Sequence, residues 1–201
     1  MRNSLRPVVV ALALPGCALL GKSEPLVPRY FTPEYAASAP AAPAVPALRL
    51  RLGRVEGRAS LRERMASRLA DREVRYAEDR RWTERPEVYL RRALARTLFE
   101  ERGLVEAQIG RALTLDVELI AFEEVVPLRL ARLEARLVLR DDRVALLEET
   151  ITAEQPIAAA VGDDVAPAVV EALSQALQAG VARMADRVIA AMATAPPPAA
   201  R

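Results

Sequence analysis

Five pairs of neighbouring carboxylates are the residues of this sequence best suited to acid–base chemistry, because two carboxyl groups flanking a substrate can share the roles of acid and base. The pairs are Glu100–Glu101, Glu123–Glu124, Asp141–Asp142, Glu148–Glu149 and Asp163–Asp164. Each has a simpler structural interpretation, as a helix end, a strand end, a turn, a solvated strand face or a helix cap. The sequence holds no histidine and no P-loop, GxGxxG or GxSxG motif. We therefore predict no catalytic residue, no cofactor and no metal site.

Cys17 is the only cysteine among the 201 residues, and its position indicates its chemistry. A lone cysteine forms no intramolecular disulfide, and without histidine it has no Cys–His partner. Arg2 and Arg6 precede an apolar stretch, residues 8–14, that is much shorter than the roughly 20 residues needed to span a bilayer. This layout is typical of a secretory signal peptide.

The end of that segment, LPGC at residues 14–17, resembles a bacterial lipobox, in which the cysteine thiol receives a diacylglycerol and becomes the first residue after cleavage. Pro15 departs from the pattern, where a small or branched residue is usual. We predict a lipoprotein signal peptide over residues 1–16 and lipidation of Cys17, with an ordinary secretory signal as the alternative. Several acyl chains make a stable membrane anchor. By resemblance to sorting in enterobacteria, Ala18 in place of aspartate indicates the outer membrane.

Composition places the rest of the chain among soluble globular proteins, with 52% hydrophobic and 28% charged residues. The 29 basic and 27 acidic residues are interleaved, which leaves a net charge of +2. Aromatic residues are only 4% of the chain. Nucleic-acid binding needs an unbalanced basic patch, and single-strand binding also needs stacking aromatics. The sequence therefore excludes nucleic acid as a partner.

One domain, residues 28–193, is predicted after a lipidated tether over residues 17–27. The repeated alanines and prolines of residues 36–47 form an extended linker within it, since they offer little to bury. Residues 194–201 are a proline-rich tail that we expect to be disordered.

Alternation of apolar and polar residues with period two predicts the strands of this domain. They cover residues 48–55, 61–69, 73–82, 113–119, 131–139 and 144–153. Leucine and arginine also favour helix over residues 128–139, but the period is two rather than 3.6. Gly53 and Gly57 indicate a bulge or turn, and Glu78–Asp79 indicates an acidic turn.

Two amphipathic helices complete the predicted fold. The first begins at Pro86, carries a leucine stripe and ends at Gly103. The second begins at a cap, Asp163 or Asp164, and continues to about Met192. We therefore predict an α/β fold in which a single mixed β-sheet of about five strands packs against both helices.

Aromatic and arginine side chains supply the candidate docking residues, because both are favoured as interface anchors. Tyr30 and Phe31 belong to RYFTPEY, the densest aromatic cluster, and Arg80, Arg81 and Trp82 belong to RRWTERP. We predict that these five residues bind a partner. For the single tryptophan we favour the alternative of a buried core residue with its N–H satisfied.

Together these features resemble the ABC-type transport auxiliary lipoproteins, the paraquat-inducible C-type family of MCE lipid transporters. The matching segments, in order after the lipobox cysteine, are RYFTPE, LRLGRV, ERMASRLADREVRYAEDRRW, RRALARTL, LDVELIAFEE and AVVEALSQALQAGVARMADRV. No single motif is highly specific, but their order covers nearly the full length. The insertion at residues 36–47 and Pro86 depart from the family pattern.

The resemblance implies a non-catalytic periplasmic domain, anchored to the outer membrane at Cys17. Its implied partners are an MCE-domain protein and an ABC transporter complex that moves lipid between membranes. Association of the chain with copies of itself is a further possibility that the resemblance leaves open. The family fold implies a mixed sheet with helices on both faces. Two alternatives remain, an outer-membrane assembly or activator lipoprotein that docks another envelope complex, and a periplasmic lipid carrier.

Overall fold

The computed structural model describes residues 25–35, 48–142, 144–159, 162 and 164–194. Several features predicted from the sequence lie outside these residues. They are the signal peptide 1–16, Cys17, most of the tether, the linker 36–47, Asp163 and the tail from residue 195.

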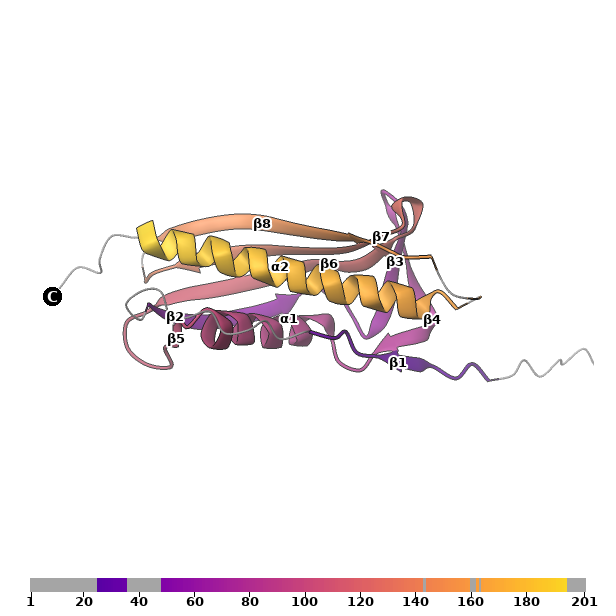
Figure 1. The fold of residues 1–201 in the computed structure, drawn as a ribbon, viewed down its shortest axis with the longest axis horizontal. Helices are drawn as coiled ribbons and strands as arrows, with labels where there is room; N and C mark the ends of the chain where they lie inside the picture. Colours follow the sequence, from indigo (N-terminus) through magenta and orange to yellow (C-terminus); the bar gives the residue numbers. More distant parts are fainter. Residues whose placement is uncertain (1–24, 36–47, 143, 160–161, 163, 195–201) are drawn as a thin grey trace, which may run out of the picture.

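Eight strands and two helices make up the described part of the chain (Figure 1). The strands are β1 Arg29–Phe31, β2 Arg49–Gly57, β3 Arg64–Ala70, β4 Glu73–Trp82, β5 Val105–Glu106, β6 Leu113–Val125, β7 Leu130–Arg140 and β8 Ala145–Pro156. The helices are α1 Pro86–Ala95, which continues into a π-helical turn at Arg96–Glu101, and α2 Ala166–Thr194. A 3₁₀ turn, Val126–Leu128, joins β6 to β7.

The longest strand, β6, organises the sheet. One edge of β6 pairs in parallel with β2 along its first half and with β3 along its second half. Its other edge pairs antiparallel with β7, and β8 lies outside β7. Beyond β3 come β4, antiparallel to β3, and then β1, parallel to β4. The short β1 therefore lies at one end of the strand order β1-β4-β3-β6-β2-β5.

The alternation of apolar and polar residues predicted the long strands correctly. In β7 the odd-numbered residues from Ala131 to Leu139 are fully buried, which confirms a strand rather than a helix. Gly53 accompanies a register shift between Leu52 and Val55, as predicted, and a Cβ there would lie 2.3 Å from Oδ1 of Asp116.

Two predictions about the strands were wrong. The sheet has eight strands rather than about five, because β1 and β5 have only three and two residues and show no periodicity of their own. No turn forms at Glu78–Asp79, since β4 continues through both residues. The residues of β4 between Tyr76 and Arg81 exceed those of β3 opposite them, and the register shift between Arg64 and Ala66 of β3 accommodates the difference.

The ends of the helices follow the capping signals. Pro86 occupies the first turn of α1, and Gly103 ends the π-helical turn with φ of 70°, the left-handed conformation expected of a C-terminal glycine. The backbone N–H of Leu104 donates to the carbonyl of Leu98 at 3.0 Å. At the start of α2, Oδ1 of Asp164 accepts a hydrogen bond from the N–H of Ala166 at 3.1 Å.

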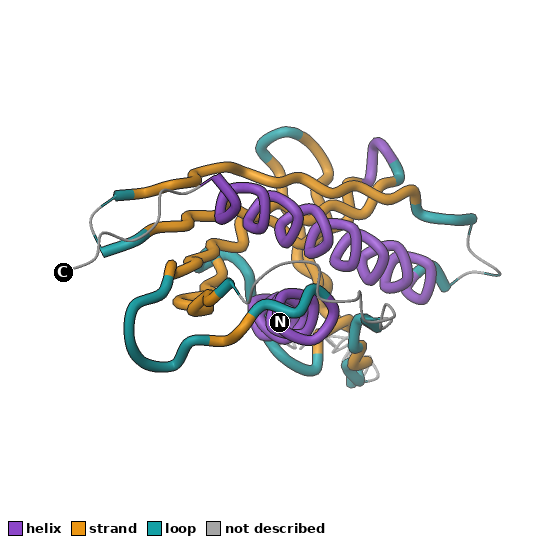
Figure 2. The backbone as a smooth tube through the Cα atoms, turned by 60° about the vertical axis from the view of Figure 1, so that its left-hand side comes forward, coloured by secondary structure: helices purple, strands orange, loops and turns teal. Residues whose placement is uncertain are grey.

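Both helices pack on the same face of the sheet, so the expectation of helices on both faces is wrong (Figures 1 and 2). α1 packs against β2 and β6, α2 packs against β7 and β8, and the helices contact each other. Their apolar stripes and the inner face of the sheet form one core, in which Leu94, Leu133 and Val181 are fully buried. None of the described helices is long and apolar enough to cross a membrane.

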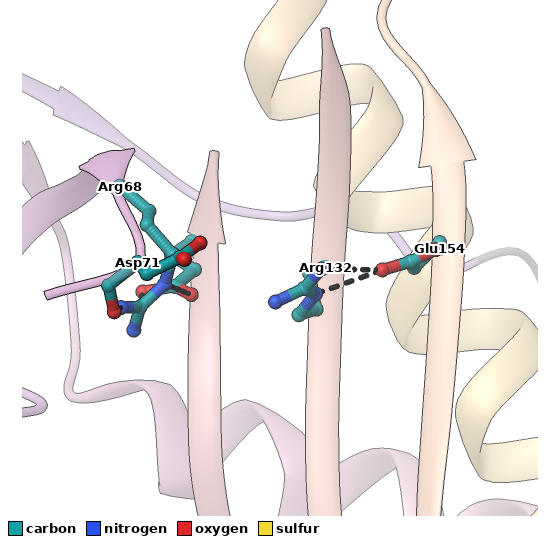
Figure 3. A network of polar contacts seen from close by, with 5 residues as sticks. Arg68, Asp71, Arg132 and Glu154 are labelled. Carbon is teal, nitrogen blue, oxygen red and sulfur yellow. Dashed lines mark hydrogen bonds and ion pairs between the residues drawn. The ribbon is translucent and has the colours of Figure 1, made fainter. Parts of the chain in front are cut away.

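Charged side chains cover the other face of the sheet, where no described helix packs. Arg132 of β7 pairs with Glu154 of β8 at 2.8 Å (Figure 3). Arg68 of β3 pairs with the buried Glu123 of β6 at 2.6 Å. The hydrogen bond with Glu123 raises the pKa of Arg68. Further cross-strand pairs are Arg136–Glu148 and Arg140–Asp116, and Arg58, directly after β2, pairs with Glu118 of β6. These pairs explain how a sheet covered on one side can present its second face to water.

Candidate docking site

Four of the predicted docking residues meet at one edge of the sheet. The parallel pairing of β1 with β4 sets Tyr30 beside Arg81 and Phe31 beside Trp82, and Arg80 lies next to Arg81. The sequence analysis treated the RYFTPEY segment and the RRW segment as separate candidates. We call the group of Tyr30, Phe31, Arg80 and Arg81 the β1 edge.

Trp82, the fifth predicted docking residue, lies in the core. Its side chain is 1% exposed, and its ring lies 5.2 Å from that of Phe122 and 6.2 Å from that of Tyr89, measured between centroids. Its neighbour Phe31 packs partly buried against the same core. The core interpretation of Trp82 is therefore confirmed, and in the folded domain its side chain offers no surface to a partner.

Two arginines on the helix side of this edge are balanced by carboxylates. Arg29 and Arg80 are neighbours across β1 and β4. Arg29 forms an ion pair with Asp164 at 2.8 Å, next to the start of α2, and Arg80 lies 3.6 Å from Asp79. The hydrogen bond from Arg29 is the largest effect that holds the pKa of Asp164 below its usual range. The sequence analysis identified Asp164 only as a helix cap. Its ion pair with Arg29 joins residues that are far apart in the sequence, so no local pattern predicts it.

The opposite side of the edge carries Tyr30 and Arg81. Directly opposite residues in a sheet point to the same face, and the β3–β4 register adds Arg64 opposite Arg81. Tyr30 is 59% exposed, and Arg64 is also exposed. Sequence reasoning missed Arg64, since its position depends on the register shift in β4.

After β1 the chain crosses both helices. The backbone N–H of Glu34 donates to Oγ of Ser174 in α2 at 3.0 Å. The hydroxyl of Tyr35 hydrogen-bonds to Thr97 and, at 3.3 Å, to Glu101, both in the π-helical turn. Burial is the main cause that raises the pKa of Tyr35. These contacts fix the β1 edge against α1 and α2, and no pattern in the sequence predicted them.

Two of the paired carboxylates singled out in the sequence form ion pairs within the fold. No group of three or more potential metal ligands occurs among the described residues. Glu148 and Glu149 point to opposite faces of β8, where they pair with Arg136 and Arg187. A hollow of about 330 Å³ over β2 and β6 is lined mainly by charged side chains, namely Arg54, Glu56, Asp116, Glu118 and Arg136.

Three solved structures share this fold. A protein from Xanthomonas campestris, of family DUF330, has a TM-score of 0.68 at 19% identity, covering 81% of this chain and 95% of its own. An uncharacterised protein has a TM-score of 0.61 at 15% identity, covering 81% and 99%. A hypothetical protein from Chlamydia trachomatis has a TM-score of 0.52 at 11% identity, covering 74% and 99%. These identities support a shared fold alone.

A search of curated proteins finds no match to the chain. A family model matches residues 31–185, which extend from the end of β1 far into α2 and include most of the β1 edge. The model describes the ABC-type transport auxiliary lipoprotein component. The match covers well over half of the sequence, and the order of strands and helices agrees with the resemblance seen in its motifs. The chain therefore belongs to the ABC-type transport auxiliary lipoprotein component family.

Proposed function

We propose that this chain is a non-catalytic auxiliary component of an ABC/MCE-type intermembrane lipid transport system, anchored in the outer membrane and facing the periplasm. The observation that carries the proposal is the family match over residues 31–185. A lipoprotein needs an acylated cysteine, and Cys17 is the only cysteine in the sequence. Acylation of Cys17, after removal of residues 1–16, is part of the proposal.

The position of the β1 edge relative to the anchor supports a docking role close to the membrane. Eleven residues lie between Cys17 and Arg29, and the twelve residue steps from one to the other span about 40 Å when fully extended. β1 and the start of α2 lie at the same end of the domain, where the described chain begins at residue 25 (Figure 1). Lipidation would therefore hold this edge near the lipid surface.

The MCE-domain protein is proposed to dock on the helix side of the β1 edge. Phe31 and Arg80 supply a partly buried aromatic ring and a guanidinium, the residue types favoured at interfaces. The outer face of α2 continues this surface with exposed Glu171 and Gln175, next to the Ser174 that anchors the chain after β1. An adaptor of this kind binds its partner without ATP or added lipid.

The packing favours an adaptor over a lipid carrier with its own cavity. A carrier must enclose acyl chains in an apolar space. Here the two helix stripes and the inner face of the sheet fill one another, with Leu90, Leu137 and Leu177 among the residues at most 2% exposed. The hollow over β2 and β6 is lined mainly by charged groups, which suit acyl chains poorly.

A binding experiment with purified proteins tests the proposal. The acylated protein in detergent is expected to capture the MCE-domain protein encoded beside it, in the absence of ATP and added lipid. Arg80→Glu should abolish capture, whereas Arg49→Glu, the same charge change at an exposed position of β2, should retain it. Failure of the wild-type protein to capture the MCE-domain protein, with capture of a peptidoglycan enzyme or a secretin instead, would support the activator alternative.

A further inference from the structure

Arg64 and Arg81 form a pair of cations that the described fold does not balance. They lie directly opposite each other in β3 and β4, so both guanidinium groups leave the same face of the sheet. Like charges in this arrangement repel and destabilise a sheet. Neither side chain has an ion-pair or hydrogen-bond partner among the described residues, and the buried Nε of Arg81 is left without an acceptor.

The helix side of the same edge shows how such a pair is satisfied. Arg29 and Arg80 are also neighbours across two strands, and the carboxylate of Asp164 compensates them. Both arginines contribute to the lowered pKa of Asp164, through the hydrogen bond from Arg29 first and the charge of Arg80 after it. On the outward side no described carboxylate takes that place. An oxyanion from outside the domain would complete the arrangement.

Exposed apolar side chains lie beside Arg81 and along the chain that leads into β1. Tyr30 lies beside Arg81 and is 59% exposed, and the preceding Leu26 and Val27 are 58% and 78% exposed. Exposed aliphatic residues, a tyrosine and arginines together are typical of surfaces that lie at a membrane interface, with apolar groups among the acyl chains and cations at the headgroups. The edge is also within about 45 Å of Cys17 along the thirteen residues up to Tyr30.

We propose that Arg64 and Arg81 bind the phosphate of a phospholipid headgroup, while Leu26, Val27 and Tyr30 lie in the membrane interface. This inference rests on the proposed anchoring through Cys17. Guanidinium groups bind phosphate oxygens through paired hydrogen bonds, and the guanidinium groups of Arg64 and Arg81, on the same face of the sheet, have no partner within the described residues to compete for them. The outward side of the β1 edge thus faces lipid, and the helix side remains free for the protein partner.

A single fluorescent label measures this contact in the full acylated protein. When Cys17 is acylated, an introduced cysteine is the only free thiol, so Val27→Cys can be labelled with an environment-sensitive nitrobenzoxadiazole group. In vesicles containing phosphatidylglycerol we expect blue-shifted emission and protection from iodide quenching. The matched control is Ile109→Cys, 82% exposed in the loop between β5 and β6, where the label should stay accessible.

Paired variants test the two arginines. Arg64→Gln with Arg81→Gln should lower the ratio of docked to undocked label on the order of 30-fold, because each arginine at an anionic lipid surface contributes roughly a fivefold factor. Arg29→Gln with Arg80→Gln removes the same charge from the other side of the edge and should retain most of the docking. Equal emission in the Arg64/Arg81 variant and the parent, or an equal loss in both double variants, overturns the inference.

Three further measurements separate the causes of a negative result. The intact mass reports whether Cys17 is acylated, so an unacylated chain contradicts the anchor, and an acylated chain with an exposed label contradicts only the headgroup site. Release of the label by inorganic phosphate, to the extent seen in the Arg64/Arg81 variant, would identify a free oxyanion as the ligand and overturn the lipid assignment. Without lipid, the Arg64/Arg81 variant should melt no lower than the parent, since repulsion is removed; a lower melting temperature would indicate an internal partner and contradict the inference.

Discussion

Replacing Trp82 by alanine is expected to destabilise the whole domain without removing a docking residue. Trp82 is 1% exposed at the end of β4, and it joins α1 to the sheet through Tyr89 and Phe122. Alanine would leave a cavity between these elements, because packed cores collapse only partly around a missing side chain.

The expected cost follows from these contacts. Truncation of a buried tryptophan to alanine costs roughly 3–5 kcal/mol, and each aromatic pair accounts for about 0.5–1.5 kcal/mol of such a loss. With ring centroids at 5.2 Å from Phe122 and 6.2 Å from Tyr89, Trp82 makes two such pairs. We expect a loss of about 4 kcal/mol in the free energy of unfolding. For a domain of this size that corresponds to a drop of about 8–16 °C in melting temperature.

Thermal unfolding of the purified protein, followed by circular dichroism, measures this loss. Trp82→Phe is the matched control, since it keeps an aromatic ring in the core and should cost only about 1–2 kcal/mol. An unchanged melting temperature for Trp82→Ala, together with lost capture of the MCE-domain protein, would refute the reasoning and assign Trp82 to an interface.

Two further predictions concern the anchor and the crossing segment after β1. Cys17→Ser should abolish incorporation of a radioactive fatty acid in cells, because only the thiol accepts the diacylglycerol; equal label in both proteins would contradict lipidation. Burial raises the pKa of Tyr35 above its ordinary 10.0, so its stabilising effect is complete below that pH and is lost as the pH rises through the folded-state pKa. Tyr35→Phe should therefore lose less stability than the wild type between neutral and strongly alkaline pH in urea unfolding, and identical pH dependence would contradict this assignment.

Burial on one face made the long strands predictable from sequence. The alternation at Ala131–Leu139 reflects a core on one side and charges such as Arg132 and Arg136 on the other, so the period itself reports the structure. β1 and β5 show no such alternation of apolar and polar residues. β1 pairs with β4 and β5 pairs with β2, both far away in sequence, and the two strands have only three and two residues of their own, too few for a local pattern.

The candidate site was predictable in its residues but not in its assembly. Aromatic and arginine content selected Tyr30, Phe31, Arg80 and Arg81, yet the β1–β4 register that joins them is a long-range contact. Residue type alone left Trp82 with two interpretations, because a tryptophan next to two arginines fits a core as well as an interface, and its burial in the fold decides for the core. The balancing of Arg29 by Asp164 depends on where α2 begins relative to β1, which only the packed fold determines.

The central claim, that this lipoprotein docks an MCE-domain protein at its membrane-proximal edge, is tested most directly by crosslinking in cells. A photo-crosslinking amino acid at Gln175, exposed on α2 beside the contact between Ser174 and Glu34, should form an adduct with the MCE-domain protein. The same amino acid at Ile109, 82% exposed far from the β1 edge, should not. Adducts from residue 175 with another envelope protein, and none with the MCE-domain protein while Cys17 is acylated, would contradict the account.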